Sequence, residues 1–172
     1  MEKFCKTWQL LPLESSDVEA SRNFYKALGL NLFISSLMKQ GKIIARFKGS
    51  TKYPGKFYLT MTSQFQAPND MLRYTLGPFE PKMEGGDSED DAIKDHVVQL
   101  NRFTSYFKLT ENGEVLKQCI IPTNQNQQVT AVVTRYIDEE GNMRQNMECN
   151  GMKVHKVFKP IDHLSAEDEE NE

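Results

Sequence analysis

Two segments with strand-like alternation each carry one cation among apolar residues. Alternation groups Lys156 with Val154 and Phe158 on one face. In the other segment it groups Arg135 with Val133. A cation on an enclosed apolar face is costly unless it is paired or hydrated, and a ligand carboxylate would satisfy it. The pattern leaves two interpretations open: inward-facing cations that bind a ligand carboxylate or, in the opposite register, cations that lie exposed on an outer face.

Residues that serve as metal ligands or nucleophiles form no constellation in this sequence. The three histidines are far apart, no C-x-x-C pair occurs, and neither G-x-G-x-x-G nor G-x-x-x-x-G-K-[ST] is present. His155 follows Cys149 closely across Asn150-Gly151, but alternation puts their side chains on opposite faces. The lysines are scattered rather than clustered with aromatics, which argues against nucleic acid. We therefore predict no metal, no cofactor and no enzymatic activity.

Charge is distributed unevenly along the chain. The net charge is -3, yet residues 81–99 carry -4 and residues 162–172 carry -6, which leaves +7 on the remainder. Acidic segments of this kind are typical of disordered, solvated chain that aids solubility. The alternative is that they shield a basic surface that would otherwise attract anionic membranes or ligands.

Length and cysteine content limit the class of protein. No run of about 18 apolar residues is present, and the first ten residues lack the apolar segment of a secretory signal. Three cysteines cannot form a disulfide framework, which favours a reduced, cytoplasmic chain, although a mature secreted form would look the same. The 172 residues fit one domain, which we expect over 1–161, followed by a disordered acidic tail over 162–172.

Helix signals occur only near the start. Ser16 and Glu19 form a capping box, an apolar stripe follows, and Gly29 is a stop signal. A second short helix is predicted over 32–40, with Gly41 as its stop. Helices of this length are marginal alone, so both must pack against the rest of the fold.

The sequence after residue 41 is typical of strands and turns. Short segments rich in aromatic and β-branched residues recur about every ten residues, which indicates an antiparallel sandwich or barrel of nine or ten strands. An up-and-down barrel removes the sheet edges, can enclose a cavity and can be capped by the two helices. The predicted strands are 4–11, 43–47, 56–65, 71–76, 102–109, 115–121, 129–137, 143–149 and 152–158.

Five short motifs, in order along the chain, resemble motifs of the intracellular fatty-acid-binding proteins. The resemblance covers residues 1–80 and 100–161. The motifs are FCKTWQL at 4–10 (family F-x-G-T-W-x-L), YKALG at 25–29 (x-K-A-L-G), TSQF at 62–65 (T-S-T-F), LGPFE at 76–80 (L-G-x-x-F-E) and VHKVF at 154–158 (x-x-R-x-Y).

The resemblance implies an all-β fold, an up-and-down ten-stranded antiparallel β-barrel, with a helix-turn-helix lid after the first strand and an internal lipid cavity. Compared with the family, residues 81–99 look like an acidic loop insertion and the acidic tail is extra. Lys6 also replaces the usual glycine of the first motif.

The family holds a fatty-acid carboxylate with two arginines and a tyrosine from its last strands. Position by position, these fall on Arg135, Lys156 and Phe158, so one arginine becomes lysine and the hydroxyl is lost. Lysine offers a point charge where arginine grips a carboxylate with two parallel bonds. We therefore expect weaker, shifted or broader headgroup recognition.

The resemblance also assigns a cavity wall and a portal. Soft side chains expected to line the cavity, unless they only fill the core, are Val133, Met147, Cys149, Met61 and Cys119. The portal residues are Leu32, Phe33, Leu37 and Phe65, of which Phe33 is equally explained by lid-to-barrel packing. Lys26 and Lys39 make the lid basic, as transient contact with anionic membranes requires.

The sequence thus predicts a monomeric, cytoplasmic carrier that binds a long-chain fatty acid or a related hydrophobic ligand for storage and intracellular transport. The altered carboxylate clamp keeps a second interpretation open. In it, the chain is a non-carrier structural, stress-protective or partner-binding protein that retains the barrel and uses its acidic segments.

Overall fold

The structure is a computed structural model, and it describes residues 1–15, 18–28, 42–64, 71–83, 93–98, 101–110, 112–123 and 130–162. The predictions that lie outside these ranges concern the capping residue Ser16, the helix 32–40 with Leu32, Phe33, Leu37 and Lys39, the portal residue Phe65 and the tail beyond residue 162.

Strands make up most of the described chain, and each of the nine predicted strands occurs. The helices in these ranges are η1 (Glu2–Phe4), η2 (Pro12–Glu14) and α1 (Val18–Ala27). The strands are β1 (Thr7–Leu10), β2 (Lys42–Gly49), β3 (Phe57–Gln64), β4 (Met71–Phe79), β5 (Lys82–Met83), β6 (Ile93–Val98), β7 (Asn101–Leu109), β8 (Val115–Pro122), β9 (Ala131–Ile137), β10 (Met143–Cys149) and β11 (Met152–Ile161).

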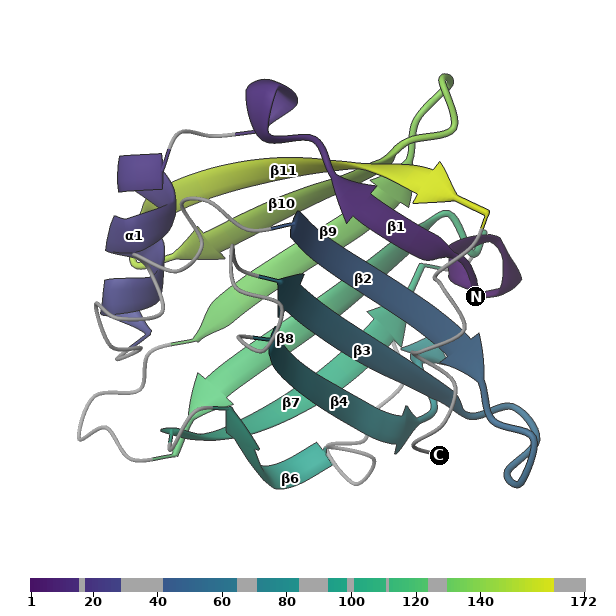
Figure 1. Ribbon diagram of the computed structural model, residues 1–172. Coiled ribbons are helices and arrows are strands. Elements are labelled where there is room, and N and C mark those ends of the chain that lie inside the picture. The colour runs from purple at the N-terminus through teal and green to yellow at the C-terminus, as the bar shows by residue number, and fades with distance from the viewer. Residues whose placement is uncertain are drawn as a thin grey trace.

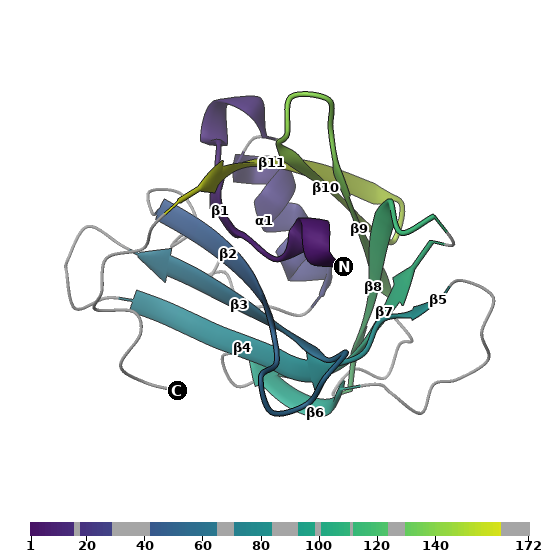
Figure 2. The ribbon, with the colours of Figure 1, turned by 90° about the vertical axis from the view of Figure 1, so that its right-hand side faces the viewer.

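The strands follow one another around an up-and-down barrel. Antiparallel ladders join β4, β3, β2, β1, β11, β10, β9, β8 and β7 in that order, and β6 pairs with the other side of β7. β4 and β6 lie side by side and bring the two ends of the sheet together, with no ladder between their described residues (Figure 2). α1 lies across one mouth of the barrel and packs on β10 and β11 (Figure 1). The predicted barrel with a helical lid is confirmed.

The prediction that residues 81–99 are a plain acidic loop is wrong for the part that forms strands. Ile93–Val98 is β6, the tenth strand of the barrel wall, and Lys82–Met83 is β5, which runs parallel to the end of β7. Three of the six residues of β6 are β-branched, and their pairing covers an edge of β7 that would otherwise stay open. The surrounding acidic residues hid this strand signal in the sequence.

Apolar side chains form two clusters inside the barrel. The larger cluster contains Trp8 and Phe158, and the Trp8 indole N–H donates to the carbonyl oxygen of Phe4 at 3.0 Å. The smaller cluster packs Phe24 of α1, and Leu28 directly after the helix, onto β9, β10 and β11. Burial of each large apolar side chain contributes about 1.5–3 kcal/mol, so α1 is held mainly by this second cluster. Polar side chains lie between the clusters, and they form the candidate site.

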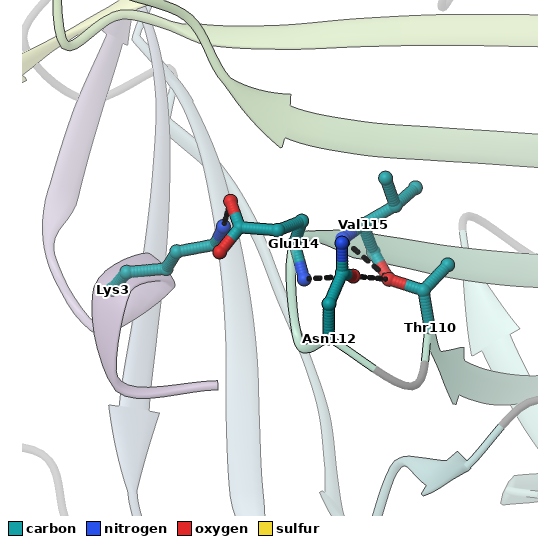
Figure 3. A network of polar contacts seen from close by, with 5 residues as sticks. All are labelled: Lys3, Thr110, Asn112, Glu114 and Val115. Carbon is teal, nitrogen blue, oxygen red and sulfur yellow. Dashed lines mark hydrogen bonds and ion pairs between the residues drawn. The ribbon is translucent and has the colours of Figure 1, made fainter.

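A polar network fixes the β7–β8 turn and ties the N-terminal segment to it (Figure 3). The Thr110 hydroxyl donates to Asn112 Oδ1 at 2.8 Å and accepts from the Val115 N–H at 3.0 Å. Asn112 Oδ1 also accepts from the Glu114 N–H at 3.0 Å. Lys3 of η1 forms an ion pair with Glu114, which anchors η1 at the end of the barrel away from α1.

Gly77 in β4 is a position where only glycine fits. Its φ is 136°, and a Cβ there would lie 2.7 Å from the Phe57 carbonyl oxygen and 3.2 Å from Tyr58 Cα. Because these are backbone atoms that cannot move aside cheaply, Gly77→Ala should lower the free energy of unfolding by about 2–4 kcal/mol. The control is Gly49→Ala in β2, where the nearest atom would be 4.0 Å away, and it should change stability by less than about 0.5 kcal/mol. Urea denaturation measures both, and equal stabilities would contradict the close approach.

Candidate functional site

Arg135 is the centre of the polar layer inside the barrel. The register places it on β9 directly opposite Gln145 of β10, and Gln118 of β8 lies diagonally across from it. The Arg135 side chain is 4% exposed. Its Nε–H donates to Gln145 Oε1 at 2.8 Å, and its Nη2 donates to Gln118 Oε1 at 2.9 Å. Two neutral amides therefore hold the guanidinium in place without neutralising its charge.

The third guanidinium nitrogen of Arg135 has no acceptor among the described residues. Nη1 is fully buried and makes no hydrogen bond to any residue that the structure describes. The guanidinium carbon Cζ lies 5.7 Å from the ring centroid of Phe47. Burial lowers the pKa of Arg135 to about 10, so the guanidinium remains charged near pH 7. The buried polar side chains of the described chain include no carboxylate. A buried donor without an acceptor costs about 1–3 kcal/mol, and more when it is charged, so an anion placed here would be stabilised.

Two phenols face the same space as the guanidinium. Tyr25 comes from α1 and Tyr74 from β4, and both line the cavity that Arg135 lines. Burial raises the pKa of both phenols above the ordinary value, while Arg135 acts in the opposite direction. Both hydroxyls therefore keep their protons and are available as donors. The lost hydroxyl at Phe158 thus has possible substitutes on other elements, which the sequence comparison did not identify.

Lys156 is the second cation of the interior, and it lies behind the cavity wall. Alternation on β11 turns it inward as predicted, and the register aligns Lys156, Gln145 and Arg135 across three adjacent strands. Neighbouring strands are about 4.8 Å apart, so the two cationic residues are separated by about 10 Å of sheet. Nζ of Lys156 lies 5.4 Å from the ring centroid of Tyr25, and burial lowers the pKa of this amine to about 8.

The cavity under α1 has a volume of about 100 Å³. Its roof is formed by Phe24 and Tyr25 of α1 and by Leu28, which directly follows the helix. The walls are formed by Met61, Tyr74, Leu76, Phe103, Ser105, Gln118, Ile120, Val133, Arg135, Gln145 and Met147. Pockets for drug-sized ligands are usually about 300–1,000 Å³, so a long acyl chain fits only if the roof moves.

The structure places the predicted wall residues in different surroundings. Arg135, Val133, Met147 and Met61 line the cavity. Phe158 faces inward but belongs to the cluster around Trp8, and Cys149 packs in the cluster under α1, so neither lines the cavity. The expectation for Cys119 is wrong, because β8 turns Leu116, Gln118 and Ile120 inward and leaves Cys119 on the outer, partly exposed side.

Other chemistry finds little support in the described part of the chain. No group of three His, Cys, Asp or Glu side chains comes together there to hold a metal ion. Burial raises the pKa of the Cys5 and Cys149 thiols, which disfavours the reactive thiolate. Among the described helices, none is long and apolar enough to cross a membrane.

Comparisons with known proteins identify the fold. No family model matches the sequence, and no curated protein does. Fatty-acid-binding protein 1 of Echinococcus granulosus is similar in structure, with 12% identity, a TM-score of 0.67 and coverage of 94% of this chain and 100% of that one. The fatty acid binding protein of Schistosoma mansoni, solved in complex with arachidonic acid, has 14% identity and a TM-score of 0.63, and the match covers 94% of this chain and 98% of that one. Secretory abundant heat soluble protein 4 from Ramazzottius varieornatus has 17% identity and a TM-score of 0.62, and the match covers 94% of this chain and 97% of that one.

At these identities the likeness establishes the fold of fatty-acid-binding proteins, the calycin type of β-barrel, over nearly the whole chain. The five sequence motifs indicated the same fold. The ligand and the role of this chain are separate questions.

Lys156 should make folding stability depend on pH. An unfolded lysine keeps its proton up to about pH 10.5, whereas folded Lys156 loses it near pH 8. Between these values the unfolded state binds more protons, so the free energy of unfolding should rise with pH, by about 3 kcal/mol across the window. Lys156→Met should lack this rise and should be the more stable protein at pH 7, because no charge is buried.

Urea denaturation from pH 7 to 10 tests the effect as a difference between variant and parent. The matched control is Lys153→Met, because the Lys153 side chain is 75% exposed on the same strand. It should keep the rise. Identical pH dependence in the parent and in Lys156→Met would show that Lys156 is not the group responsible.

Proposed function

We propose that the barrel binds a hydrophobic ligand with an anionic headgroup, a long-chain fatty acid or a related molecule, for storage and transport. The ligand carboxylate accepts hydrogen bonds from Arg135 Nη1 and from the hydroxyls of Tyr25 and Tyr74. Its chain lies among the apolar cavity residues. Lys156 adds a more distant positive charge. The role proposed is binding rather than catalysis.

The observation that carries this proposal is the buried, unneutralised guanidinium. Arg135 is held by amides, no buried carboxylate is present in the described chain, and Nη1 has no described acceptor. A protein that needed only a filled core would be more stable with an apolar residue here. An anionic ligand would supply the missing acceptor. The solved structures with this fold include a protein in complex with arachidonic acid, which supports the same class of ligand.

Entry and accommodation of the ligand require movement of the roof. Phe24 and Tyr25 of α1, with Leu28 just after it, occupy space that an acyl chain of more than a few carbons needs, because the cavity measures only about 100 Å³. α1 is a single ten-residue helix held mainly by one apolar cluster. We infer that α1 moves outward to admit the chain and closes on its end, so that the lid gates the cavity.

The setting of this carrier is part of the proposal. Three free cysteines favour a reducing, cytoplasmic compartment. Lys26, exposed in the last turn of α1, provides a basic contact for anionic membranes from which ligand is collected. We expect the carrier to act as a monomer, since β4 and β6 lie side by side and bring the two ends of the sheet together.

Removal of the Arg135 charge should weaken carboxylate ligands selectively. Arg135→Met is expected to weaken oleate binding about 10–100-fold, the scale of a charged hydrogen bond of about 1.5–3 kcal/mol. Oleyl alcohol, which lacks the carboxylate, should keep its affinity within about threefold. Displacement of a fluorescent fatty acid measures both ligands. Arg135→Lys should recover part of the oleate affinity, because the positive charge is kept.

The matched control is Arg144→Met. Arg144 lies on the outer face of β10, where its Nε donates to Asp138 Oδ2 at 2.6 Å. It should bind both ligands as the parent does. Unchanged oleate affinity in Arg135→Met would exclude Arg135 as the headgroup site.

A second candidate function is favoured by the cavity volume. At about 100 Å³ the cavity is smaller than the engineered 150 Å³ cavities that just hold benzene. A cavity this small suits a non-carrier role, structural, stress-protective or partner-binding. Secretory abundant heat soluble protein 4 shares the fold, so the fold is found in a protein whose name refers to heat solubility.

Native mass spectrometry of the protein as isolated separates the two functions. A carrier should retain lipid, at one acyl chain per protein, with a mass that organic extraction removes and lipid analysis identifies. A protein free of lipid that also fails to bind a panel of fatty acids and retinoids would support the non-carrier function and contradict the carrier.

A further inference from the structure

The outer face of β2, β3 and β4 carries a basic groove. It has a volume of about 420 Å³ and contains four cations, namely Arg46 and Lys48 of β2, Lys52 of the β2–β3 loop and Arg73 of β4. Thr60 and Thr75 form its floor, with their hydroxyls 3.0 Å apart. Over residues 42–64 and 71–79 the sequence has six Lys and Arg and no Asp or Glu. We call this surface the β2–β4 groove.

The two arginines of the β2–β4 groove differ from the outer-face cations that pair with described carboxylates. Elsewhere, Lys3 pairs with Glu114, Arg144 with Asp138 and Lys153 with Glu148. Arg46 and Arg73 form no ion pair with any described residue. Like charges confined to one groove repel one another, so an anion that neutralises several of them would be attracted.

The chain itself carries a matching anion close by. Residues 162–172 hold six acidic residues and no Lys or Arg. Ile161, the last residue of β11, pairs with Thr7 of β1, and Thr7 pairs with Arg46 of β2. The chain therefore leaves the barrel level with Arg46 and about 10 Å from it, two strand spacings away.

The direction of β11 also favours this contact. β11 runs antiparallel to β1, and β1 runs antiparallel to β2, so β11 and β2 point the same way and end at the same side of the barrel (Figure 1). The end of β11 therefore lies on the same side of the barrel as the end of β2, where Lys48 and Lys52 lie. Eleven residues reach at most about 36–40 Å when extended, whereas the far side of the groove at β4 is about 20 Å away.

We propose that the acidic C-terminal segment, residues 163–172, binds in the β2–β4 groove of its own chain. Its carboxylates pair with Arg46, Lys48, Lys52 and Arg73. The contact screens the basic outer surface of the barrel and makes the segment a built-in competitor for any anion that approaches this face. This proposal is independent of the ligand inside the barrel, because the groove lies on the opposite side of the sheet from Arg135.

Zero-length cross-linking of the full chain tests the contact. A water-soluble carbodiimide joins a carboxylate to a lysine amine only when the two touch. An equal mixture of ¹⁴N- and ¹⁵N-labelled protein separates links within one chain from links between chains. We expect links from Glu167–Glu172 mainly to Lys48 and Lys52, within one chain. They should fall at least about tenfold in 1 M NaCl, where the screening length is about 3 Å.

Two arginine variants provide the matched comparison. Arg46→Gln/Arg73→Gln removes two groove charges but keeps both reporter lysines, and it should lower the yield of these links severalfold. Arg102→Gln/Arg144→Gln removes two outer-face arginines outside the groove and should leave the yield unchanged. As a second readout, replacing each Asp and Glu of residues 167–172 with Asn and Gln should shift the backbone amide NMR signals of Arg46, Lys48, Thr60 and Thr75.

Two results would overturn the proposal. In the first, links spread evenly over outer-face lysines such as Lys117 and Lys153, which would mean that the segment has no preferred surface. In the second, the links to Lys48 and Lys52 join differently labelled chains, which would mean that a second copy occupies the groove.

Discussion

A buried guanidinium that has no carboxylate partner among the described residues is the interaction on which the interior of this structure depends. Arg135 is 4% exposed and still charged near neutral pH, so its surroundings must satisfy it with neutral groups. Gln118 and Gln145 do so from the strands on either side, and the polar layer they form divides the apolar core in two. The cavity lies where this layer meets the roof of α1. The site and the cavity therefore both lie at the one polar layer that this charge requires.

Much of the fold could be predicted from the sequence, because alternation and turn residues are local signals. The inward face of β9, with Val133 and Arg135, was correct, and Asn150 and Gly151 both adopt the positive φ of a tight hairpin. β6 was missed because charged neighbours outweighed its β-branched residues. The amides were missed although Gln118 and Gln145 share inward parity with buried Leu116 and Met143, a signal that was available. Tyr25 and Tyr74 meet Arg135 only through tertiary packing, and cavity volume depends on side-chain packing that no motif records.

Both inside and outside the barrel there are cations that have no carboxylate partner among the described residues. Inside, Arg135 and Lys156 have no described carboxylate, and the proposed ligand supplies one. Outside, Arg46 and Arg73 have none either, and the proposed partner is the acidic end of the same chain. The net charge of -3 thus hides a basic barrel, and in both proposals an anion from elsewhere pairs with cations that have no described carboxylate. The two sites lie on opposite faces of the sheet, so each can be occupied without the other.

The central claim is that a ligand carboxylate accepts the hydrogen bond that Arg135 Nη1 does not make to the described residues. ¹³C NMR of carboxyl-labelled oleate tests this claim most directly. A carboxylate paired with a buried guanidinium should stay ionised well below its ordinary pKa of about 4–5. The account predicts one protein-bound carboxyl resonance that keeps its ionised chemical shift down to about pH 3–4 in the parent, and that titrates normally in Arg135→Met. A bound resonance in the parent that titrates as it does in water would contradict the account.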